Sequence, residues 1–122
     1  MKVPAFLLRR LYVKGSLQPT QGGFEFQLRN RLGSGYARRL MPLTLDGENL
    51  DMSCTTFEVD GKRVSFDAVS EQAPFTLAMN KTTTIAYAGT PLPHGPHTVG
   101  MRFEVAGLGE MSFDFSDIAG AA

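Results

Sequence analysis

The chain has 122 residues, with twelve acidic side chains, twelve basic side chains and a single cysteine. This length is typical of one domain and suffices to bury a core without a disulfide or a metal ion. A lone cysteine excludes an internal disulfide, and no apolar stretch is long enough to span a membrane. The apolar run at the start stops at Arg9, too early for a secretory signal. We therefore predict a single cytoplasmic domain over residues 1–122, with no membrane partner and a loose tail at residues 117–122.

Charge is unevenly distributed along the chain. Residues 1–40 carry eight bases and one acid, a net charge of +7, whereas residues 41–122 carry four bases and eleven acids, a net charge of −7. Two interpretations remain open: basic strands pair with acidic strands across a sheet, or they form a basic surface that docks an acidic partner or an anionic ligand. Nucleic acid is not expected as a partner, because the isoelectric point is near neutral and no aromatic strand of the RNA-binding type is present.

Alternation of apolar and polar residues predicts strands along most of the chain. It is clearest at residues 23–30, 97–106 and 110–116, where one face of each strand is apolar. The pairs Asp46-Gly47 and Asp60-Gly61 supply the positive φ angles of tight hairpin turns. The expected strands are 10–17, 23–30, 38–45, 48–58, 62–66, 75–79, 82–88, 97–106 and 110–116. The pattern predicts an all-β fold, an antiparallel β-sandwich of about 7–9 strands, immunoglobulin-like or jelly-roll-like, with no helix of three turns.

The sequence contains few candidates for catalytic residues. His94 and His97 lie three positions apart, but a zinc site needs three or four ligands and no third is indicated. No strained turn marks a nucleophilic serine, no glycine-rich phosphate loop opens a helix, and the acidic residues lie on strand faces and turns, where they are ordinarily solvated. We predict that this chain is not catalytic alone and holds no metal or other cofactor.

Two segments stand out as candidate binding regions. The loop at residues 30–37 follows a strongly patterned strand and contains two glycines, an arginine and a tyrosine, which suit an interface, although an ordinary flexible loop is the alternative. Residues 12–17 form either a strand with a glycine bulge or an edge left for a partner. The candidates for a substrate pocket or a partner interface are Tyr12, Lys14, Ser16, Asn30, Arg31 and Tyr36.

These segments carry a resemblance to a known family. The motifs LYVKGSL (11–17) and GFEFQLRNRL (23–32) resemble the small (β) subunit of C-glycoside deglycosidases. The likeness continues through PLTLDG (42–47), VSEQAP (69–74), GPHT (95–98) and FDFSD (113–117). It spans nearly the whole chain and includes no rare catalytic signature.

The resemblance implies a function in a carbon–carbon lyase that cleaves 3-oxo-C-glycosides of flavonoids. In that family a TIM-barrel α subunit holds a divalent metal, usually manganese, and the β-sandwich subunit docks beside the barrel and completes the substrate pocket. No catalytic residue is carried over to this chain. Two alternatives stay open: a stand-alone β-sandwich carbohydrate-binding module, disfavoured because there is no tryptophan, and a self-contained enzyme.

Overall fold

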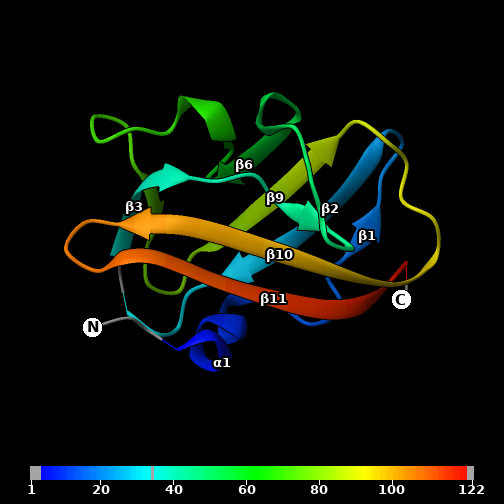
Figure 1. Ribbon diagram of the computed structural model, residues 1–122, viewed down its shortest axis with the longest axis horizontal. Helices are drawn as coiled ribbons and strands as arrows, with labels where there is room; N and C mark the ends of the chain where they lie inside the picture. Colours follow the sequence, from blue (N-terminus) through cyan, green and yellow to red (C-terminus); the bar gives the residue numbers. More distant parts are fainter. Residues whose placement is uncertain (1–3, 34, 121–122) are drawn as a thin grey trace.

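The computed structural model describes residues 4–33 and 35–120, and within them eleven strands form two antiparallel sheets (Figure 1). The first sheet has five strands, in an order that brings together segments far apart in sequence. In spatial order these strands are β1 (Gln18–Pro19), β2 (Gly23–Arg29), β9 (Thr82–Ala88), β6 (Thr55–Val59) and β7 (Lys62–Ser65).

The second sheet is built around its longest hairpin. That hairpin is formed by β10 (Gly95–Val105) and β11 (Gly109–Ala119), which pair along their whole length. The other edge of β10 pairs with β4 (Thr44–Leu45) and β3 (Gly35–Leu40), which in turn pair with β5 (Glu48–Asn49) and β8 (Phe75–Leu77). Short helices complete the described chain: α1 (Ala5–Leu8), η1 (Arg9–Leu11), η2 (Met52–Cys54) and η3 (Phe66–Ala68).

The predicted all-β, antiparallel fold is confirmed, with more and shorter strands than the 7–9 expected. The expected strand 38–45 divides into β3 and β4, and the expected strand 48–58 divides into β5, η2 and β6. Both hairpin turns have the predicted geometry, with positive φ at Asp46, Gly47, Asp60 and Gly61. β11 continues through Ala119, opposite Gly95, so residues 117–119 are part of a strand and not of a tail.

The predicted strand at 10–17 is wrong. Its beginning belongs to η1, and the rest forms no strand but contacts β2 through an isolated bridge between Tyr12 and Leu28. The segment runs between the two sheets: the backbone N–H of Val13 donates to the Gln27 carbonyl of the first sheet. The side chain of Arg9 donates to the Asp114 carbonyl of β11 at 2.7 Å. The N-terminal segment therefore connects an edge of one sheet to an edge of the other, a contact that local periodicity does not encode.

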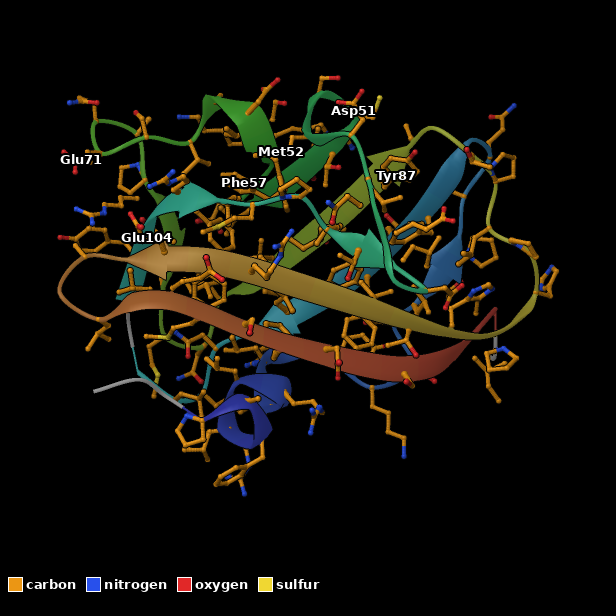
Figure 2. The ribbon with its side chains drawn as sticks, viewed as in Figure 1. Asp51, Met52, Phe57, Glu71, Tyr87 and Glu104 are labelled. Atoms are coloured by element: carbon orange, nitrogen blue, oxygen red, sulfur yellow. The ribbon has the colours of Figure 1, made fainter. Side chains whose placement is uncertain are left out.

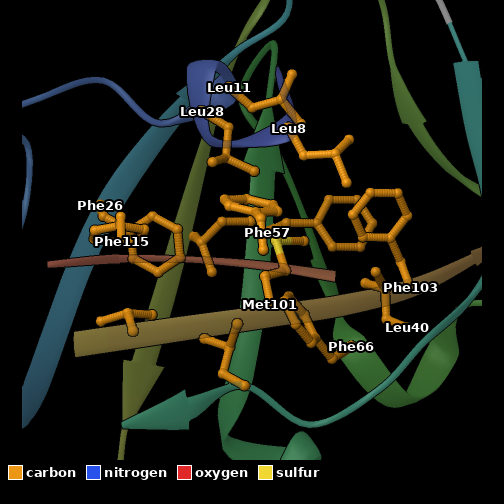
Figure 3. Packing of buried hydrophobic residues seen from close by; sticks show 14 of the residues in the cluster. Leu8, Leu11, Phe26, Leu28, Leu40, Phe57, Phe66, Met101, Phe103 and Phe115 are labelled. Carbon is orange, nitrogen blue, oxygen red and sulfur yellow. The ribbon is translucent and has the colours of Figure 1, made fainter. Parts of the chain in front are cut away.

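The alternating apolar residues of both sheets meet in one core. Phe24, Phe26 and Leu28 are fully buried on β2, as period two predicts. Figure 3 shows Leu8 and Leu11, from the N-terminal helices, in the same cluster as Phe57 and Phe103. The helices thus cover apolar side chains that the two sheets alone leave open. No helix among the described residues is long and apolar enough to cross a membrane.

Candidate functional site

An apolar cleft of about 290 Å³ opens at the end of the molecule where the β10–β11 hairpin turns. Its walls come from the N-terminal helices, the loop between β2 and β3, the start of β3, β8 and the hairpin itself. The floor includes buried side chains of the core, among them Phe75, Phe103 and Met111.

The rim of this cleft exposes large apolar side chains. Leu32 is 41% exposed, Tyr36 is 52% exposed and Leu108 is 39% exposed, and all three line the cleft. Isolated exposed apolar residues are common on soluble proteins, but a group of them around a hollow is typical of a binding site. We name Leu32, Tyr36 and Leu108 the rim residues.

Asn30 holds the loop that carries Leu32 and leads into β3, where Tyr36 lies, so residues 35–37 of the predicted loop belong to a strand. It is buried, and its side-chain amide donates to the carbonyls of Gly33 at 2.6 Å and Leu77 at 2.7 Å. Its side-chain oxygen accepts from the backbone N–H groups of Leu32 and Gly33. All the strong donors and acceptors of this amide are therefore used. Asn30 lines the cleft but acts on it as a positioning residue, which ties the loop to β8.

The six residues predicted for a site fall into two groups. Asn30 and Tyr36 line the cleft, and Arg31 lies between two lining residues and is exposed. Tyr12, Lys14 and Ser16 lie outside the cleft lining, in the segment that joins the two sheets. The role of each in binding stays a prediction. Ser34, within the predicted loop, lies outside the described residues.

The hydroxyl groups of Ser16 and Tyr12 form hydrogen bonds within the chain. The Ser16 hydroxyl donates to the Val13 carbonyl and accepts from the Gln27 backbone N–H of β2. The Tyr12 hydroxyl donates to the Asp117 carboxylate at 2.6 Å and accepts from the Leu17 N–H, while its ring stacks on Phe115. Burial, together with the hydrogen bond to Asp117, raises the pKa of Tyr12 to about 12. The same hydrogen bond holds the pKa of the Asp117 carboxyl below its usual value.

We expect the Tyr12→Phe substitution to lower the free energy of unfolding by about 1–2 kcal/mol, because it removes two hydrogen bonds and keeps the ring stack. In the folded wild type the pKa of Tyr12 is raised, so the neutral hydroxyl stabilises the fold. This stabilisation is fully present below about pH 10 and is lost as the pH rises toward 12. Urea unfolding at neutral and alkaline pH measures both effects. An unchanged unfolding free energy at neutral pH would contradict the structural role of this hydroxyl.

His97 contacts a hydrogen-bond acceptor at each of its ring nitrogens. His97 places Nδ1 at 2.7 Å from the Asp46 carboxylate and Nε2 at 2.8 Å from the Pro93 carbonyl. No group of three or more histidine, cysteine, aspartate or glutamate side chains among the described residues is arranged to hold a metal ion. Both ring nitrogens of His97 face acceptors, so the doubly protonated ring satisfies them best.

This arrangement predicts a pH-dependent stability. The hydrogen bond to Asp46 raises the pKa of His97, so its contribution is complete below about pH 6.5 and is lost as the pH rises through the higher folded value. In the wild type the unfolding free energy should fall between about pH 5.5 and 8.5 by about 1 kcal/mol or less, since the pair lies near the surface. We expect the His97→Gln variant to lose this fall. Urea melts at the two pH values measure it. The control His94→Gln is expected to keep the slope, and loss of the slope there would contradict this assignment.

Comparison with known proteins places the chain in a family. Residues 7–119 match the family of the hydroxymethylglutaryl-CoA reductase N-terminal domain. The chain belongs to this family. No curated protein matches the sequence.

The family match corrects the expected function. The resemblance to the small subunit of C-glycoside deglycosidases is wrong, and so is the predicted role in cleaving 3-oxo-C-glycosides of flavonoids. The alternative of a stand-alone carbohydrate-binding module is overturned by the same match. The motifs behind the resemblance are explained by the fold: Phe24 and Phe26 are core positions of β2, and Asp46-Gly47 is a hairpin turn. Any antiparallel sheet needs such residues. The predicted TIM-barrel partner and its manganese ion are untested by this chain and stay predictions.

Sequence reasoning missed Leu108 and the N-terminal helices as parts of the site. Leu108 lies between Gly107 and Gly109, in the turn of the β10–β11 hairpin. A large apolar side chain between two turn glycines is costly to expose and was a usable signal for a binding surface. Leu8 and Leu11 left no such signal, because their place in the cleft wall depends on contacts with β11, about a hundred residues away.

Proposed function

We propose that this chain is a protein-docking domain of a hydroxymethylglutaryl-CoA reductase, and that it binds the catalytic part of that enzyme through the rim residues Leu32, Tyr36 and Leu108. The single observation that carries the proposal is the apolar cleft with its exposed rim. The family match names the enzyme. The cytoplasmic location expected from the sequence is part of the proposal, whereas the hetero-oligomer expected from the sequence was one with a TIM-barrel subunit and stays a separate prediction.

The size and chemistry of the cleft favour a protein partner. Its volume of about 290 Å³ lies just below the range for small-molecule pockets, about 300–1,000 Å³. It has room for one large apolar side chain, as buried anchors of protein interfaces do. The surrounding rim residues would then exclude water from that anchor. A tyrosine such as Tyr36 is a preferred residue at such an interface because it combines a large apolar surface with few rotatable bonds.

The test is complex formation between the purified chain and the reductase catalytic domain encoded in the same genome, measured by isothermal titration calorimetry. We expect Tyr36→Ser to weaken binding by about tenfold or more, as loss of an interface anchor does. The control is Ile118→Ser, because Ile118 is equally exposed, at 55%, and pairs with Pro96 at the opposite end of β10. The control variant should bind as the wild type does.

Two results would overturn the proposal. One is the absence of a complex with the wild-type chain at high protein concentration. The other is an affinity that is lowered by Ile118→Ser and unaffected by Tyr36→Ser. That result would place the interface at the end of the hairpin opposite the cleft.

A further inference from the structure

β11 pairs with β10 on one side only, so within the described chain its other side is a free edge of the second sheet (Figure 1). The backbone carbonyl of Arg102 accepts from the N–H of Met41, which lies on the opposite side of β10. Arg102 faces Ser112 across the hairpin. In an antiparallel pair, opposite residues either exchange both backbone hydrogen bonds or direct both away from each other. Ser112, and with it Glu110 and Asp114, therefore directs its backbone groups to the free edge.

The N-terminal segment covers this edge only in part. The side chain of Arg9 donates to the Asp114 carbonyl at 2.7 Å, and the following residues of the N-terminal segment lie along the rest of the strand. Glu110 and Ser112 are exposed, and their outward N–H and C=O groups have no hydrogen-bond partner among the residues that the structure describes. Unpaired backbone groups at a sheet edge are a template for another strand. We name residues 110–112 the open edge.

The open edge borders the apolar cleft. Met111 lies at its centre, and the Met111 side chain is buried and lines the cleft. Leu108, a rim residue, precedes the open edge by two positions. Opposite residues of two paired strands have their side chains on the same face of the sheet. A strand added at the open edge would therefore direct the side chain opposite Met111 toward the cleft, and its two neighbours toward the outer face.

A row of charges on the outer face ends at the open edge without a cation. Glu110 lies opposite Glu104 on β10, and Glu104 lies opposite Arg39 on β3. Figure 2 shows Glu104 near the end of β10, close to the hairpin turn. Glu104 is compensated, because it pairs with Arg38 at 2.6 Å and with Arg39 at 3.3 Å, and these contacts lower its pKa. Glu110 forms no ion pair with any described residue. A basic residue opposite Glu110 would complete the row.

The same charge disfavours a second copy of this chain as the added strand. Two-fold pairing of two open edges would place Glu110 beside an exposed carboxylate of the other copy, either its Glu110 or its Asp114. Like charges on neighbouring strands are destabilising, and the pairing supplies no new cation. A different chain that carries a basic residue fits the open edge better.

We infer that the partner segment is an extended strand that adds to β11 at the open edge, with a large apolar residue opposite Met111 and a lysine or arginine opposite Glu110. This inference rests on the proposed docking function and adds the conformation and chemistry of the partner. Backbone hydrogen bonds to Glu110 and Ser112 fix the register. The apolar side chain enters the cleft between the rim residues, and the basic side chain selects the segment.

The first test uses two capped peptides, because the chain has no tryptophan and a peptide tryptophan alone reports binding. Both are rich in threonine. The core of one is threonine, tryptophan and lysine in that order, so that antiparallel pairing sets tryptophan opposite Met111 and lysine opposite Glu110. The other has glutamate in place of lysine. We expect the lysine peptide to bind the full chain with a blue shift of its emission. It should bind about twofold to fivefold tighter than the glutamate peptide, and salt should reduce the difference.

Methylation of single peptide nitrogens tests the pairing itself. In the expected register the backbone N–H of the lysine donates to Glu110, whereas that of the tryptophan points away from β11. An N-methyl group on the lysine nitrogen should weaken binding by about tenfold or more, because it removes one hydrogen bond and blocks the approach of the strands. N-methylation of the tryptophan is the matched control and should leave the affinity unchanged.

Substitutions in the chain assign the site. Glu110→Lys should reverse the preference between the two peptides, whereas Glu48→Lys, at an exposed position of β5, should not. Ser112→Pro removes an N–H that β10 does not use, so it should weaken both peptides and keep the hairpin. The N-methyl peptides carry the test if this variant fails to fold. Binding of neither peptide, equal binding of both, or equal weakening by the two N-methyl groups would overturn the inference.

Failure of this inference is distinguishable from failure of the docking function. A reductase catalytic domain that binds the Ser112→Pro and Glu110→Lys variants as tightly as the wild type would refute the added strand and leave the docking function standing. A wild-type dimer that Ser112→Pro abolishes, with no binding of either peptide, would assign the open edge to a second copy and refute the inference as well. A catalytic domain that forms no complex would refute the docking function, whatever the peptides do.

Discussion

Gly23→Ala is expected to lower the free energy of unfolding by about 3–5 kcal/mol, at the upper end for a single substitution. A Cβ added to Gly23 would lie 1.8 Å from the Tyr87 carbonyl oxygen and 3.1 Å from the Ala88 Cα of β9. Both contacts are with backbone of the neighbouring strand, so no side-chain rotation relieves them. The two central strands of the first sheet would have to separate, with loss of their ladder hydrogen bonds at that end.

Gly22→Ala is the matched control for this prediction. Its added Cβ would meet nothing within 4 Å, and Gly22 is not among the residues with positive φ. We expect a change of about 0.5 kcal/mol or less, in line with an open surface position. Thermal and urea unfolding of both variants measure the difference, and solubility on expression reports it if Gly23→Ala fails to fold. Equal stability of the two variants would contradict the pairing of β2 with β9.

Asn30→Ala is expected to destabilise the fold by about 2–4 kcal/mol, because it leaves the buried carbonyl of Leu77 without its donor and frees the backbone of the loop. Asn30→Asp keeps the size and the acceptor oxygen but removes both donated hydrogen bonds. It should therefore be at least as destabilising at neutral pH. Urea unfolding gives both values, and the alanine variant should also bind the reductase catalytic domain more weakly.

Asn49→Ala serves as the control for Asn30. Asn49 is exposed on β5, and its side chain accepts one long hydrogen bond, 3.4 Å from Arg102. We expect no more than about 0.5 kcal/mol for this change. A small effect of Asn30→Asp together with a large effect of Asn30→Ala would assign the role of Asn30 to its volume and contradict the hydrogen-bond account.

The sequence was informative wherever structure follows from neighbours in the chain. The alternation around Phe24 and Phe26 placed β2, and that around Val99 and Met101 placed β10, because one buried face imposes period two. Asp60-Gly61 marked its turn through the positive φ angles that this pair tolerates. These features are shared by antiparallel sheets in general, which is why they identified the fold and misled the assignment of family.

What the sequence did not reveal depends on contacts between distant residues. Tyr12 was expected on a strand, whereas its position is set by Asp117 and Phe115, more than a hundred residues later. Asn30 was singled out as a binding candidate, and its side chain proves to be saturated by backbone partners, one of them on β8. The cleft itself forms only when the hairpin turn, the loop and the N-terminal helices come together.

The most direct test of the docking account is amide hydrogen exchange of the chain with and without the reductase catalytic domain. The account predicts slower exchange in the complex at Leu32, at Tyr36 and at Leu108 in the hairpin turn. It predicts no change at the opposite end of the same hairpin, at His97 and Ile118. Protection confined to that opposite end, or a complex with no protection around the cleft, would contradict it.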